Sequence, residues 1–572
     1  MNKRNEKLII SLNIERRQYY IDMRMSRIFN RITIKMTSEG SSAYIDDLLD
    51  FNRIESDSSD SNVKSEVAEF FANANILVTG GTGFLGKLLI EKLLRCCPDL
   101  SKIYMIVRMK KGKAAMERFK ENFDSVYNRL RRDQPDFLNK VIMLEGDAAK
   151  ENYGLTPESK KMLMNVNIIL HAAADVRFDE SIRQASNTNV KGAKFLLTFA
   201  RQLPNLKVFV HVSTAFSQCV HEVIEEEHYK DTIDCDKFMT LVDILDDEKL
   251  QEITPALLGK WPNTYVLSKA LAENVVLKYG DDLPVCIIRP SIVISTFKEP
   301  IEAWTNNMYG ATGIVVGCAV GFIRTLHCIP ENAAELIPAD YVVSNIICAA
   351  WDTYNRKLAR ESNPNLNEPE GEKIPVYNCV SSYQNPISWK EFMQEIEYRG
   401  MRIPSIKVVW YYMLILNRYL FVNQIMAFFL HTIPATIADA MAYVSGRKPM
   451  CLETYKKVNK FSTVLTYFTI REWKFHNGNV IKLWEKMNCT DREKFCFNIA
   501  TLDWKEYFSN HVKGIRLYLL NDPLDTLPEG RKKYQKLRIA HYSILTVGMI
   551  LVMWFILAFL YLFRNLWTFA HK

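Results

Sequence analysis

The sequence predicts an α/β fold with a doubly wound parallel sheet, a smaller lobe after it, a helical C-terminal domain and a C-terminal transmembrane helix. Three observations support this prediction. Short β-branched runs alternate with longer helical patterns between about residues 67 and 300, and a glycine-rich turn follows the first of these runs. An uncharged apolar segment near the C-terminus is long enough to cross a bilayer.

Composition indicates a multidomain globular protein. The chain has 572 residues, 48% of them hydrophobic, so it can bury more than one core. Its net charge of +8, from 73 basic and 65 acidic residues, is too small to indicate nucleic-acid binding. The 12 cysteines contain no C-x-x-C pair and no zinc-type spacing with histidine. We therefore expect no metal site, and reduced thiols in a cytosolic compartment.

Residues 1–66 are predicted to be a basic extension followed by a disordered linker. The Arg-rich start shows no secretory signal, and it is either a transit peptide or a dispensable extension with Met36 as an alternative start. We favour the extension because the segment carries several acidic residues and little serine. Residues 37–66 are rich in Ser, Asp and Glu without apolar periodicity, so order should begin near Val67.

A Rossmann domain with its substrate lobe is predicted over residues 67–400, because six β-branched runs alternate with helical stretches. Beyond Pro300 the pattern changes to loops and mixed elements, with Val376–Val380 as a further strand candidate and Glu361–Lys373 as an exposed insertion. The six predicted strands are Ile76–Val78, Ile103–Val107, Val141–Leu144, Ile168–Leu170, Val208–Val212 and Val285–Ile288.

Two further regions follow this domain. Residues 401–433 are predicted to form a pair of hydrophobic helices that are interfacial or buried rather than spanning, since polar side chains interrupt the apolar run from Val408 to Leu430. Residues 434–525 are predicted to form a helical C-terminal domain.

Residues 543–563 are predicted to form a single transmembrane helix. Ile544–Phe563 carries no charge and is flanked by Tyr542, Tyr561 and Trp567, which suit an interfacial aromatic belt. The alternative, a buried core helix, would be unusual so near a terminus. The positive-inside rule places the large N-terminal part in the cytosol, and both the endoplasmic reticulum and the peroxisome stay open as the organelle. The upstream basic residues are Arg531, Lys532, Lys533, Lys536 and Arg538, against Arg564 and Lys572 beyond the span.

A glycine turn between the first predicted strand and a leucine-striped helix indicates a dinucleotide site. Gly80 allows the sharp turn, Gly83 lets the backbone approach a pyrophosphate, and Gly86 permits close packing of helix on sheet. The positive end of the helix dipole then faces the phosphates. The predicted cofactor residues in this turn are Thr79, Gly80, Gly83, Phe84, Leu85 and Gly86.

The residue after the second predicted strand favours NADPH as the cofactor. NAD-binding sites place a carboxylate there for the ribose 2′-hydroxyl, whereas this chain has Arg108, which can bind a 2′-phosphate. A solvated basic face is the alternative, because Lys110 and Lys111 follow. Asp147 stands where a carboxylate could meet the adenine edge. The other cofactor residues predicted on later elements are Ala148, Ala172, Tyr265, Lys269 and Pro290.

A Tyr-x-x-x-Lys pair after the fifth predicted strand indicates proton-transfer chemistry. Tyr265 and Lys269 lie about one helical turn apart and share a face. Lowering a tyrosine pKa by about 2 units needs roughly 2.7 kcal/mol, and an ammonium about 5 Å away offers on the order of 3 kcal/mol. The preceding strand ends in Ser213 and Thr214, and Thr214 is the favoured hydroxyl for the substrate oxygen, with Ser213 second. Asn189 could anchor a proton-relay water, or be a satisfied polar residue of a helix.

These motifs resemble the fatty acyl-CoA reductases, a family of extended short-chain dehydrogenases, over roughly Val67 to Leu520. Two positions depart from the family pattern: Phe216 stands where a tyrosine is usual, and Glu302-Ala303-Trp304 begins the stretch that replaces Pro-Gly-Trp-Ile-Asp-Asn. The departures leave the proton-transfer set intact but put substrate fit in doubt. The resemblance rests on Val-Thr-Gly-Gly-Thr-Gly-Phe-Leu-Gly-Lys from Val78, His-Val-Ser-Thr-Ala from His211, Thr-Tyr-Val-Leu-Ser-Lys from Thr264, Ile-Ile-Arg-Pro-Ser from Ile287, Ile-Pro-Ala-Asp from Ile337 and Tyr-Asn-Cys from Tyr377.

The resemblance implies NADPH-dependent reduction of a long-chain fatty acyl-CoA to a fatty alcohol with release of CoA. In the implied mechanism Tyr265 and Thr214 stabilise the oxyanion formed by hydride attack, CoA leaves, and Tyr265 is the general acid of a second reduction. A bilayer partner suits this chemistry because acyl chains and their alcohols partition into lipid. Two alternatives stay open: a related oxidoreductase acting on a sterol or an aldehyde, and a membrane-tethered nucleotide-binding scaffold without turnover.

Overall fold

The computed structural model describes residues 63–110, 112–363 and 373–567, and the backbone of the last helix as far as Ala570. The predicted extension and linker lie outside the described residues up to position 62, as does most of the predicted insertion at 361–373. The first described helix, α3 (Glu66–Phe70), begins where order was expected to begin.

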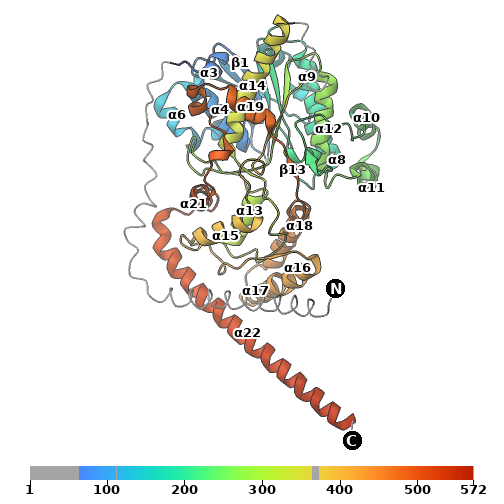
Figure 1. The fold of residues 1–572 in the computed structure, drawn as a ribbon, viewed down its shortest axis with the longest axis vertical. Helices are drawn as coiled ribbons and strands as arrows, with labels where there is room; N and C mark the ends of the chain where they lie inside the picture. Colours follow the sequence, from blue (N-terminus) through green and yellow to red (C-terminus); the bar gives the residue numbers. More distant parts are fainter. Residues whose placement is uncertain (1–62, 111, 364–372, 571–572) are drawn as a thin grey trace, which may run out of the picture. The chain divides into compact units, whose positions relative to one another are not determined.

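A seven-stranded parallel sheet lies at the centre of the fold (Figure 1). Its strand order is β11-β7-β5-β4-β1-β2-β3, and every pairing is parallel. The order reverses between β1 and β4, so the carboxyl ends of the strands there border the crevice in which such sheets bind ligands. The strands are β1 (Asn75–Thr79), β2 (Lys102–Val107), β3 (Val141–Glu145), β4 (Ile168–His171), β5 (Val208–Val212), β7 (Val285–Pro290) and β11 (Val376–Cys379).

All six predicted strands are confirmed, and the run at Val376–Val380 adds a seventh. This last strand pairs in parallel with β7, with Asn378 opposite Arg289, so it extends the main sheet instead of belonging to the lobe alone. The sequence could not show this, because a long stretch of loops and helices separates the two paired strands along the chain.

Helices cover both faces of the sheet (Figure 1). Ile76 and Val78 of β1 belong to the hydrophobic core that includes α4 (Phe84–Cys96) and α14 (Ala339–Ser362). Leu77, between them, belongs to the opposite core with α9 (Gly192–Ala200) and α12 (Thr264–Gly280), as expected when side chains alternate across a strand. Smaller helices flank these layers: α5 (Ala115–Asn122), α6 (Asn128–Asp133), α7 (Pro157–Leu163), α8 (Ile182–Ala185), α10 (Cys235–Ile244) and α11 (Asp247–Leu258).

The elements after β7 build a lobe beside the carboxyl edge of the sheet, and some of them return to the sheet itself. Asp491 accepts hydrogen bonds from the Ser65 hydroxyl and from the backbone N–H groups of Glu66 and Val67. The predicted boundary at 434 between two domains stays a prediction. The elements are α13 (Ala311–Ala319), α15 (Trp389–Gly400), α18 (Cys451–Thr469), α19 (Gly478–Lys486), α20 (Cys489–Lys494), α21 (Trp504–Gly514), β8 (Ile292–Ile294), β9 (Thr325–His327), β10 (Leu336–Pro338), β12 (Ile415–Asn417) and β13 (Lys474–Phe475). Strand β13 pairs with the earlier β6 (Val223–Ile224).

Residues 401–433 differ from the predicted helix pair. They contain strand β12, which pairs in parallel with β9, and then the start of one long helix. That helix runs through α16 (Leu420–Ala427), a π-helical turn η7 (Phe428–Thr432) and α17 (Ile433–Val444). None of the residues of α16 is buried, whereas His431 in η7 is. The sequence could not reveal this, because an apolar run does not say which side faces outward.

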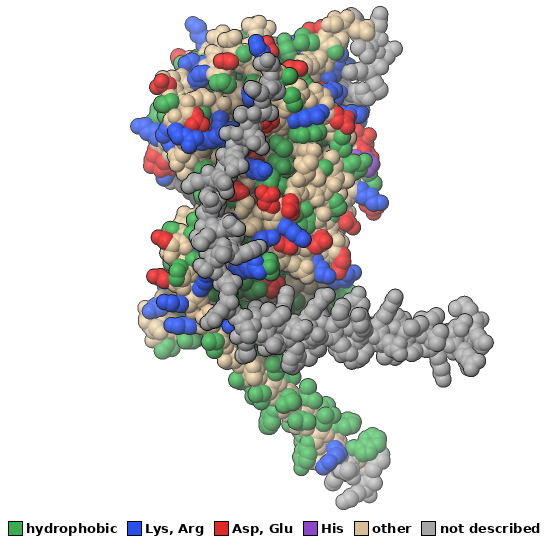
Figure 2. Space-filling model, turned by 60° about the vertical axis from the view of Figure 1, so that its left-hand side comes forward, with side chains coloured by type: hydrophobic (Ala, Val, Ile, Leu, Met, Phe, Trp, Pro, Cys, Tyr) green, Lys and Arg blue, Asp and Glu red, His purple; other side chains and the backbone are tan. Residues whose placement is uncertain are grey.

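Helix α22 (Leu527–Ala570) contains the predicted transmembrane segment. Its second half exposes nearly all of its large hydrophobic side chains, which cover the surface of the helix in Figure 2. Its first half packs on the domain, where the Trp410 indole donates a hydrogen bond to Nδ1 of His541 at 3.1 Å. By length and apolarity, the helices at Leu420–Val444 and Leu524–Trp567 could each cross a membrane.

Candidate active site

A cavity of about 620 Å³ lies at the carboxyl edge of the sheet, between the glycine turn and the lobe. Loops that follow the central strands line one side, and α12, α13 and α18 contribute the other. Of the predicted site residues only Asn189 lies outside its lining. Those that line it are Thr79, Gly80, Gly83, Phe84, Leu85, Gly86, Arg108, Asp147, Ala148, Ala172, Ser213, Thr214, Tyr265, Lys269 and Pro290.

The glycine turn is packed so tightly that a side chain at Gly80, Gly81 or Gly86 would force neighbouring atoms to move. Gly80 has a left-handed φ of +74°, and a Cβ there would lie 2.8 Å from the backbone nitrogen of Ala173. A Cβ on Gly86 would lie 2.2 Å from the carbonyl oxygen of Gly80, so this glycine packs within the turn, not against the sheet as predicted. Gly83 is the N-cap of α4, and no side chain caps this helix. A Cβ on Gly83 would lie 3.1 Å from the carbonyl oxygen of Gly80. This cradle fits a dinucleotide pyrophosphate.

Thr79 holds the ends of β1 and β4 together beneath this turn. Its hydroxyl is 2.8 Å from Nδ1 of His171 and accepts a hydrogen bond from the backbone N–H of Ala173. Burial and the charge of Lys269 lower the pKa of His171 to about 3, so this imidazole is neutral. Thr79 therefore positions the turn as well as lining the cavity.

Two arginines, Arg108 and Arg118, lie beside Thr82 of the glycine turn and line the cavity. The guanidinium of Arg118 donates to the carbonyl of Arg108 and, at 2.9 Å, to the hydroxyl of Thr82. Arg108 lies 3.6 Å from Asp147, and all four of these residues line the cavity. Burial and the charge of Arg108 lower the pKa of Arg118, as expected where two cations share a site suited to an anion. Arg118 could not be predicted as a site residue from the sequence, because it lies on α5 with no motif to mark it.

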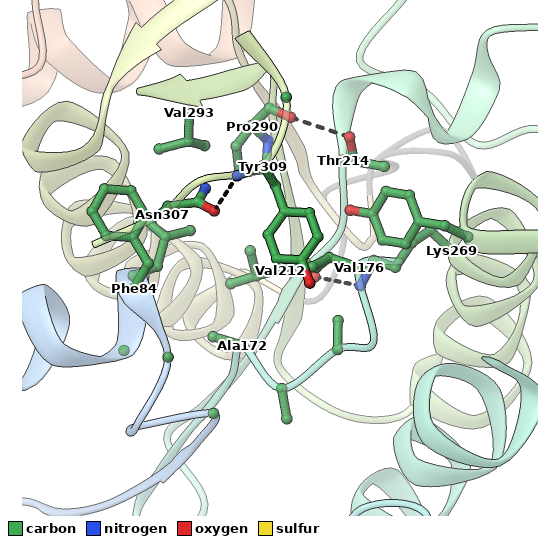
Figure 3. Close-up of a pocket in the computed structure, with 18 of the residues that line it drawn as sticks. Phe84, Ala172, Val176, Val212, Thr214, Lys269, Pro290, Val293, Asn307 and Tyr309 are labelled. Atoms are coloured by element: carbon green, nitrogen blue, oxygen red, sulfur yellow. Dashed lines mark hydrogen bonds between the residues drawn. The ribbon is translucent and has the colours of Figure 1, made fainter. Parts of the chain in front are cut away.

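Helix α12 presents Tyr265 and Lys269 to the cavity from successive turns. Asn263 caps the helix by accepting a hydrogen bond from the Val266 N–H, which fixes where the helix begins. The Lys269 ammonium donates to the carbonyl oxygen of Val212 at 2.6 Å, and a dashed line near the centre of Figure 3 marks this bond. The pair therefore meets the end of β5, as the sequence predicted.

Burial controls the ionisation of both groups. It raises the pKa of Tyr265 to about 12, an effect that the Thr214 hydroxyl only partly offsets by hydrogen bonding. It lowers the pKa of Lys269 to about 8, although the carboxylate of Glu273 acts in the opposite direction. The expectation that Lys269 lowers the tyrosine pKa is therefore not met, because desolvation raises it and the group that acts in the opposite direction is the Thr214 hydroxyl. The phenol stays protonated, and so can donate a hydrogen bond, across the physiological range.

A buried ion pair between α12 and β7 separates the roles of Ser213 and Thr214. Glu273 is bonded to the fully buried Arg289 at 2.8 Å, and it also accepts hydrogen bonds from the hydroxyls of Ser213 and Ser217. Burial alone would raise the pKa of Glu273, but Arg289 holds it below its usual value. The Ser213 hydroxyl is committed to this carboxylate, whereas the Thr214 hydroxyl donates a longer bond, at 3.4 Å, to the Pro290 carbonyl. Thr214 is therefore the hydroxyl better placed for a substrate.

Asn189 holds a loop instead of opening into the cavity. Its amide nitrogen donates to the carbonyl of Asp175 and to the Ser268 hydroxyl at 2.8 Å, and its oxygen accepts from the Asp175 N–H. The residue sits in a π-helical turn, η4 (Ser186–Lys191), next to α9. These contacts support a positioning role, and the predicted role of anchoring a water stays a prediction.

The lobe supplies cavity residues that sequence analysis did not single out. Tyr309 extends into the pocket between Phe84 and Lys269 in Figure 3, and its N–H donates to the side chain of Asn307. Ile314 of α13 and Phe468 of α18 add an apolar wall. No motif marks them, because they are ordinary apolar or aromatic residues brought together only by folding.

The two departures from the family pattern have clear surroundings. Phe216 packs edge-on against Phe468, Trp473 and Phe475, so a phenol oxygen at this position would meet an aromatic cluster. Ala303 has a φ of +55°, in the left-handed region that a glycine adopts without strain. The next residue, Trp304, stacks on Phe84 with ring centroids 5.6 Å apart and so supports the glycine turn.

The fold and this site define a nicotinamide-dependent reductase of the short-chain dehydrogenase type, with a Tyr–Lys pair at a dinucleotide turn. Two family models described as male sterility protein match residues 78–346 and 430–522, and the first is an NAD-binding model. The fatty acyl-CoA reductase wat of Drosophila melanogaster is 37% identical over 507 residues, which are 88% of this chain and 95% of that protein. Fatty acyl-CoA reductase 1 of Rattus norvegicus is 35% identical over 514 residues, 88% of this chain and 96% of that protein. The chain belongs to the fatty acyl-CoA reductase family.

Solved structures support the fold. The reductase domain of a nonribosomal peptide synthetase from Mycobacterium tuberculosis aligns with a TM-score of 0.50 and 18% identity. The alignment covers 80% of this chain and 96% of that domain. At this identity the likeness concerns the arrangement of strands and helices alone.

The pKa of Lys269 generates a prediction for the pH dependence of reduction. Its ammonium form is lost as pH rises through about 8, whereas Tyr265 stays protonated to about 12. We expect kcat/KM to fall above about pH 8, by up to about tenfold for each further pH unit. A Lys269→Arg variant, which keeps its charge, should retain its activity to higher pH. A kcat/KM profile that is flat or rising between about pH 7 and 10 would contradict this role for Lys269.

Proposed function

We propose that this protein reduces long-chain fatty acyl-CoA to the fatty alcohol with NADPH and releases CoA. The observation that carries the proposal is the meeting of two hydroxyls, those of Tyr265 and Thr214, beside a glycine turn shaped for a dinucleotide. An apolar wall from α13 and α18 borders the same cavity and suits an acyl chain. The proposal also rests on the family to which the chain belongs.

The chain's own groups supply the acid and the oxyanion stabilisation. Tyr265 and Thr214 donate hydrogen bonds to the thioester oxygen as negative charge develops on it, while the Lys269 ammonium offsets that charge from behind the phenol. NADPH, when bound, supplies the hydride. The C–S bond then breaks, CoA departs as a thiolate and an aldehyde remains between the same two hydroxyls. In the second round a second NADPH, when bound, would supply another hydride to the aldehyde carbon, and Tyr265 gives its proton to the resulting alkoxide oxygen, so that a primary alcohol leaves.

The preference for NADPH is proposed from the arginines at the end of the cofactor turn. Arg108 follows β2, where the ribose of a bound dinucleotide lies in sheets of this type, and Arg118 braces it through its backbone carbonyl. A guanidinium binds a 2′-phosphate through paired, charge-assisted hydrogen bonds.

Replacing Arg108 should therefore separate the two nicotinamide cofactors. We expect Arg108→Ala to raise KM for NADPH by about 10- to 100-fold, the worth of one or two charge-assisted bonds, and to leave KM for NADH nearly unchanged. Lys113→Ala is the matched control, because Lys113 is an exposed cation of the same loop that pairs with Glu121. Equal changes for both cofactors would show that Arg108 does not bind the 2′-phosphate.

Membrane attachment is proposed through α22. The helix exposes an uncharged apolar stretch of spanning length, and five basic residues precede that stretch. We propose a single pass with the reductase domain in the cytosol, by the positive-inside rule. The target membrane is proposed to be the endoplasmic reticulum or the peroxisome, where such an anchor would keep the site close to lipid-dissolved substrates and products.

The proposed reaction and the role of Tyr265 can be tested together. Membranes carrying the full chain, supplied with NADPH and acyl-CoAs of several lengths, should release free CoA and form primary alcohols. Tyr265→Phe should reduce turnover by about 10²- to 10⁴-fold while NADPH binding is kept. Tyr279→Phe is the matched control, since this tyrosine lies on the same helix but bonds Asp236.

The outcomes distinguish the alternatives. Reduction of aldehydes or sterols without release of CoA would favour a related oxidoreductase of another substrate class. NADPH binding without any product would favour a nucleotide-binding scaffold. Full activity of Tyr265→Phe would refute the proposed acid.

A further inference from the structure

The helix formed by α16, η7 and α17 carries its hydrophobic side chains on the side that faces away from the domain. It spans 25 residues, Leu420–Val444. Six large side chains on its outer face are each more than half exposed: Phe421, Ile425, Phe428, Phe429, Ile437 and Met441. We call these six residues the outer face.

On the opposite side of the helix three polar residues are bonded to the domain, whereas Gln424 and Thr436 are exposed. Asn423 accepts a hydrogen bond from the Thr325 hydroxyl at 2.7 Å. The buried His431 accepts one from the backbone N–H of Arg324 at 2.9 Å. Asp439 accepts the N–H groups at the start of α18, from Met450 to Leu452. A helix on a water-soluble surface has the reverse arrangement, with its apolar stripe inward and its polar side in solvent.

From this inverted arrangement we infer that the outer face lies in the interfacial zone of a lipid leaflet, as a second membrane contact beside α22. Asp439, on the inner side, is the sole charged residue between Leu420 and Gly446. Cationic side chains stand at both ends, Arg418 before the helix and the exposed Arg447 and Lys448 after it, where lipid headgroups would meet them. The helix does not cross the bilayer, because its inner side is held to the protein along most of its length.

The same membrane would serve the outer face and the proposed anchor. Arg324 donates to the carbonyl of Leu430 in η7, and its guanidinium lies over the ring of Trp410 at 5.6 Å. Trp410 in turn donates to His541 of α22. One arginine and one tryptophan thus connect the helix with the base of α22, and Figure 1 shows α16, α17 and α22 at the same end of the domain. The inference rests on the proposed membrane attachment.

The position of α18 gives this contact a consequence for the substrate. Its N-terminus is capped by Asp439 on the inferred membrane helix, and its C-terminal turn brings Leu465, Phe468 and Thr469 into the cavity. A single helix thereby leads from the lipid-facing surface to the acyl wall. An acyl chain that leaves the leaflet beside the outer face would reach the site along α18 without crossing water.

Lipid contact can be measured at single positions of the full chain in vesicles. Cys451, Cys489 and Cys496, the three cysteines that are not buried, are first replaced by serine. A cysteine is then introduced by Phe428→Cys or Ile437→Cys, labelled with an environment-sensitive fluorophore and reconstituted in phosphatidylcholine vesicles with nitroxide lipids. Ile244→Cys is the matched control, because Ile244 is 71% exposed on α10.

We expect a nitroxide near the lipid headgroup to quench the fluorescence of both probes on the outer face. A nitroxide at the end of the acyl chain should quench them less. The control should lose emission to neither. Probes that are not quenched and emit as in water would overturn the inference. Probes with blue-shifted emission that no nitroxide lipid quenches would also overturn it, because they indicate that a protein partner or a second copy covers the outer face. Stronger quenching by the deep nitroxide would show a spanning helix instead. Vesicle flotation of the same samples tests α22 separately, since a chain that does not float refutes the proposed anchor itself.

Discussion

The buried ion pair between Glu273 and Arg289 is the interaction on which the site geometry depends. Charges buried in protein must be paired, and removing one partner of such a pair destabilises by about 3–5 kcal/mol. Because Glu273 follows Lys269 and Tyr265 by one and two helical turns, its bond to β7 decides which face of α12 meets the sheet edge. The same carboxylate also accepts a hydrogen bond from the Ser213 hydroxyl. Thr214 is therefore the hydroxyl that remains available to a substrate in the cavity.

From this edge the rest of the molecule extends in two directions. The glycine turn after β1, Arg108 after β2 and Arg118 on α5 shape one end of the cavity for a charged dinucleotide. The lobe shapes the other end for an apolar chain. The lobe is connected to the helix α16–α17 by two contacts. Asp439 of α17 caps α18, and Arg324 donates to the carbonyl of Leu430. A water-soluble cofactor and a lipid-dissolved substrate would therefore approach the same two hydroxyls from opposite sides.

Local patterns were enough to predict the sheet and most of the cavity lining. The loops that follow parallel strands all lie at the carboxyl edge of the sheet, whatever the helices between the strands are. What depends on distant packing could not be predicted. The strand at Val376 joins the sheet across a long insertion, and Arg118 and Tyr309 reach the cavity from elements without motifs. The pKa of Tyr265 was misjudged because burial is not visible in residue spacing. The outward side of α16 was hidden for the same reason.

The central claim is that the Tyr265 and Thr214 hydroxyls face a nicotinamide and a thioester carbonyl at the same time. A structure of the full chain with NADP⁺ and a long-chain acyl-CoA, a pair that cannot turn over, tests it most directly. We predict that the thioester oxygen accepts hydrogen bonds from both hydroxyls, with the nicotinamide beside the carbonyl carbon and the acyl chain along α18. A dinucleotide bound away from the Gly80 turn, or a carbonyl out of reach of Tyr265, would contradict the account.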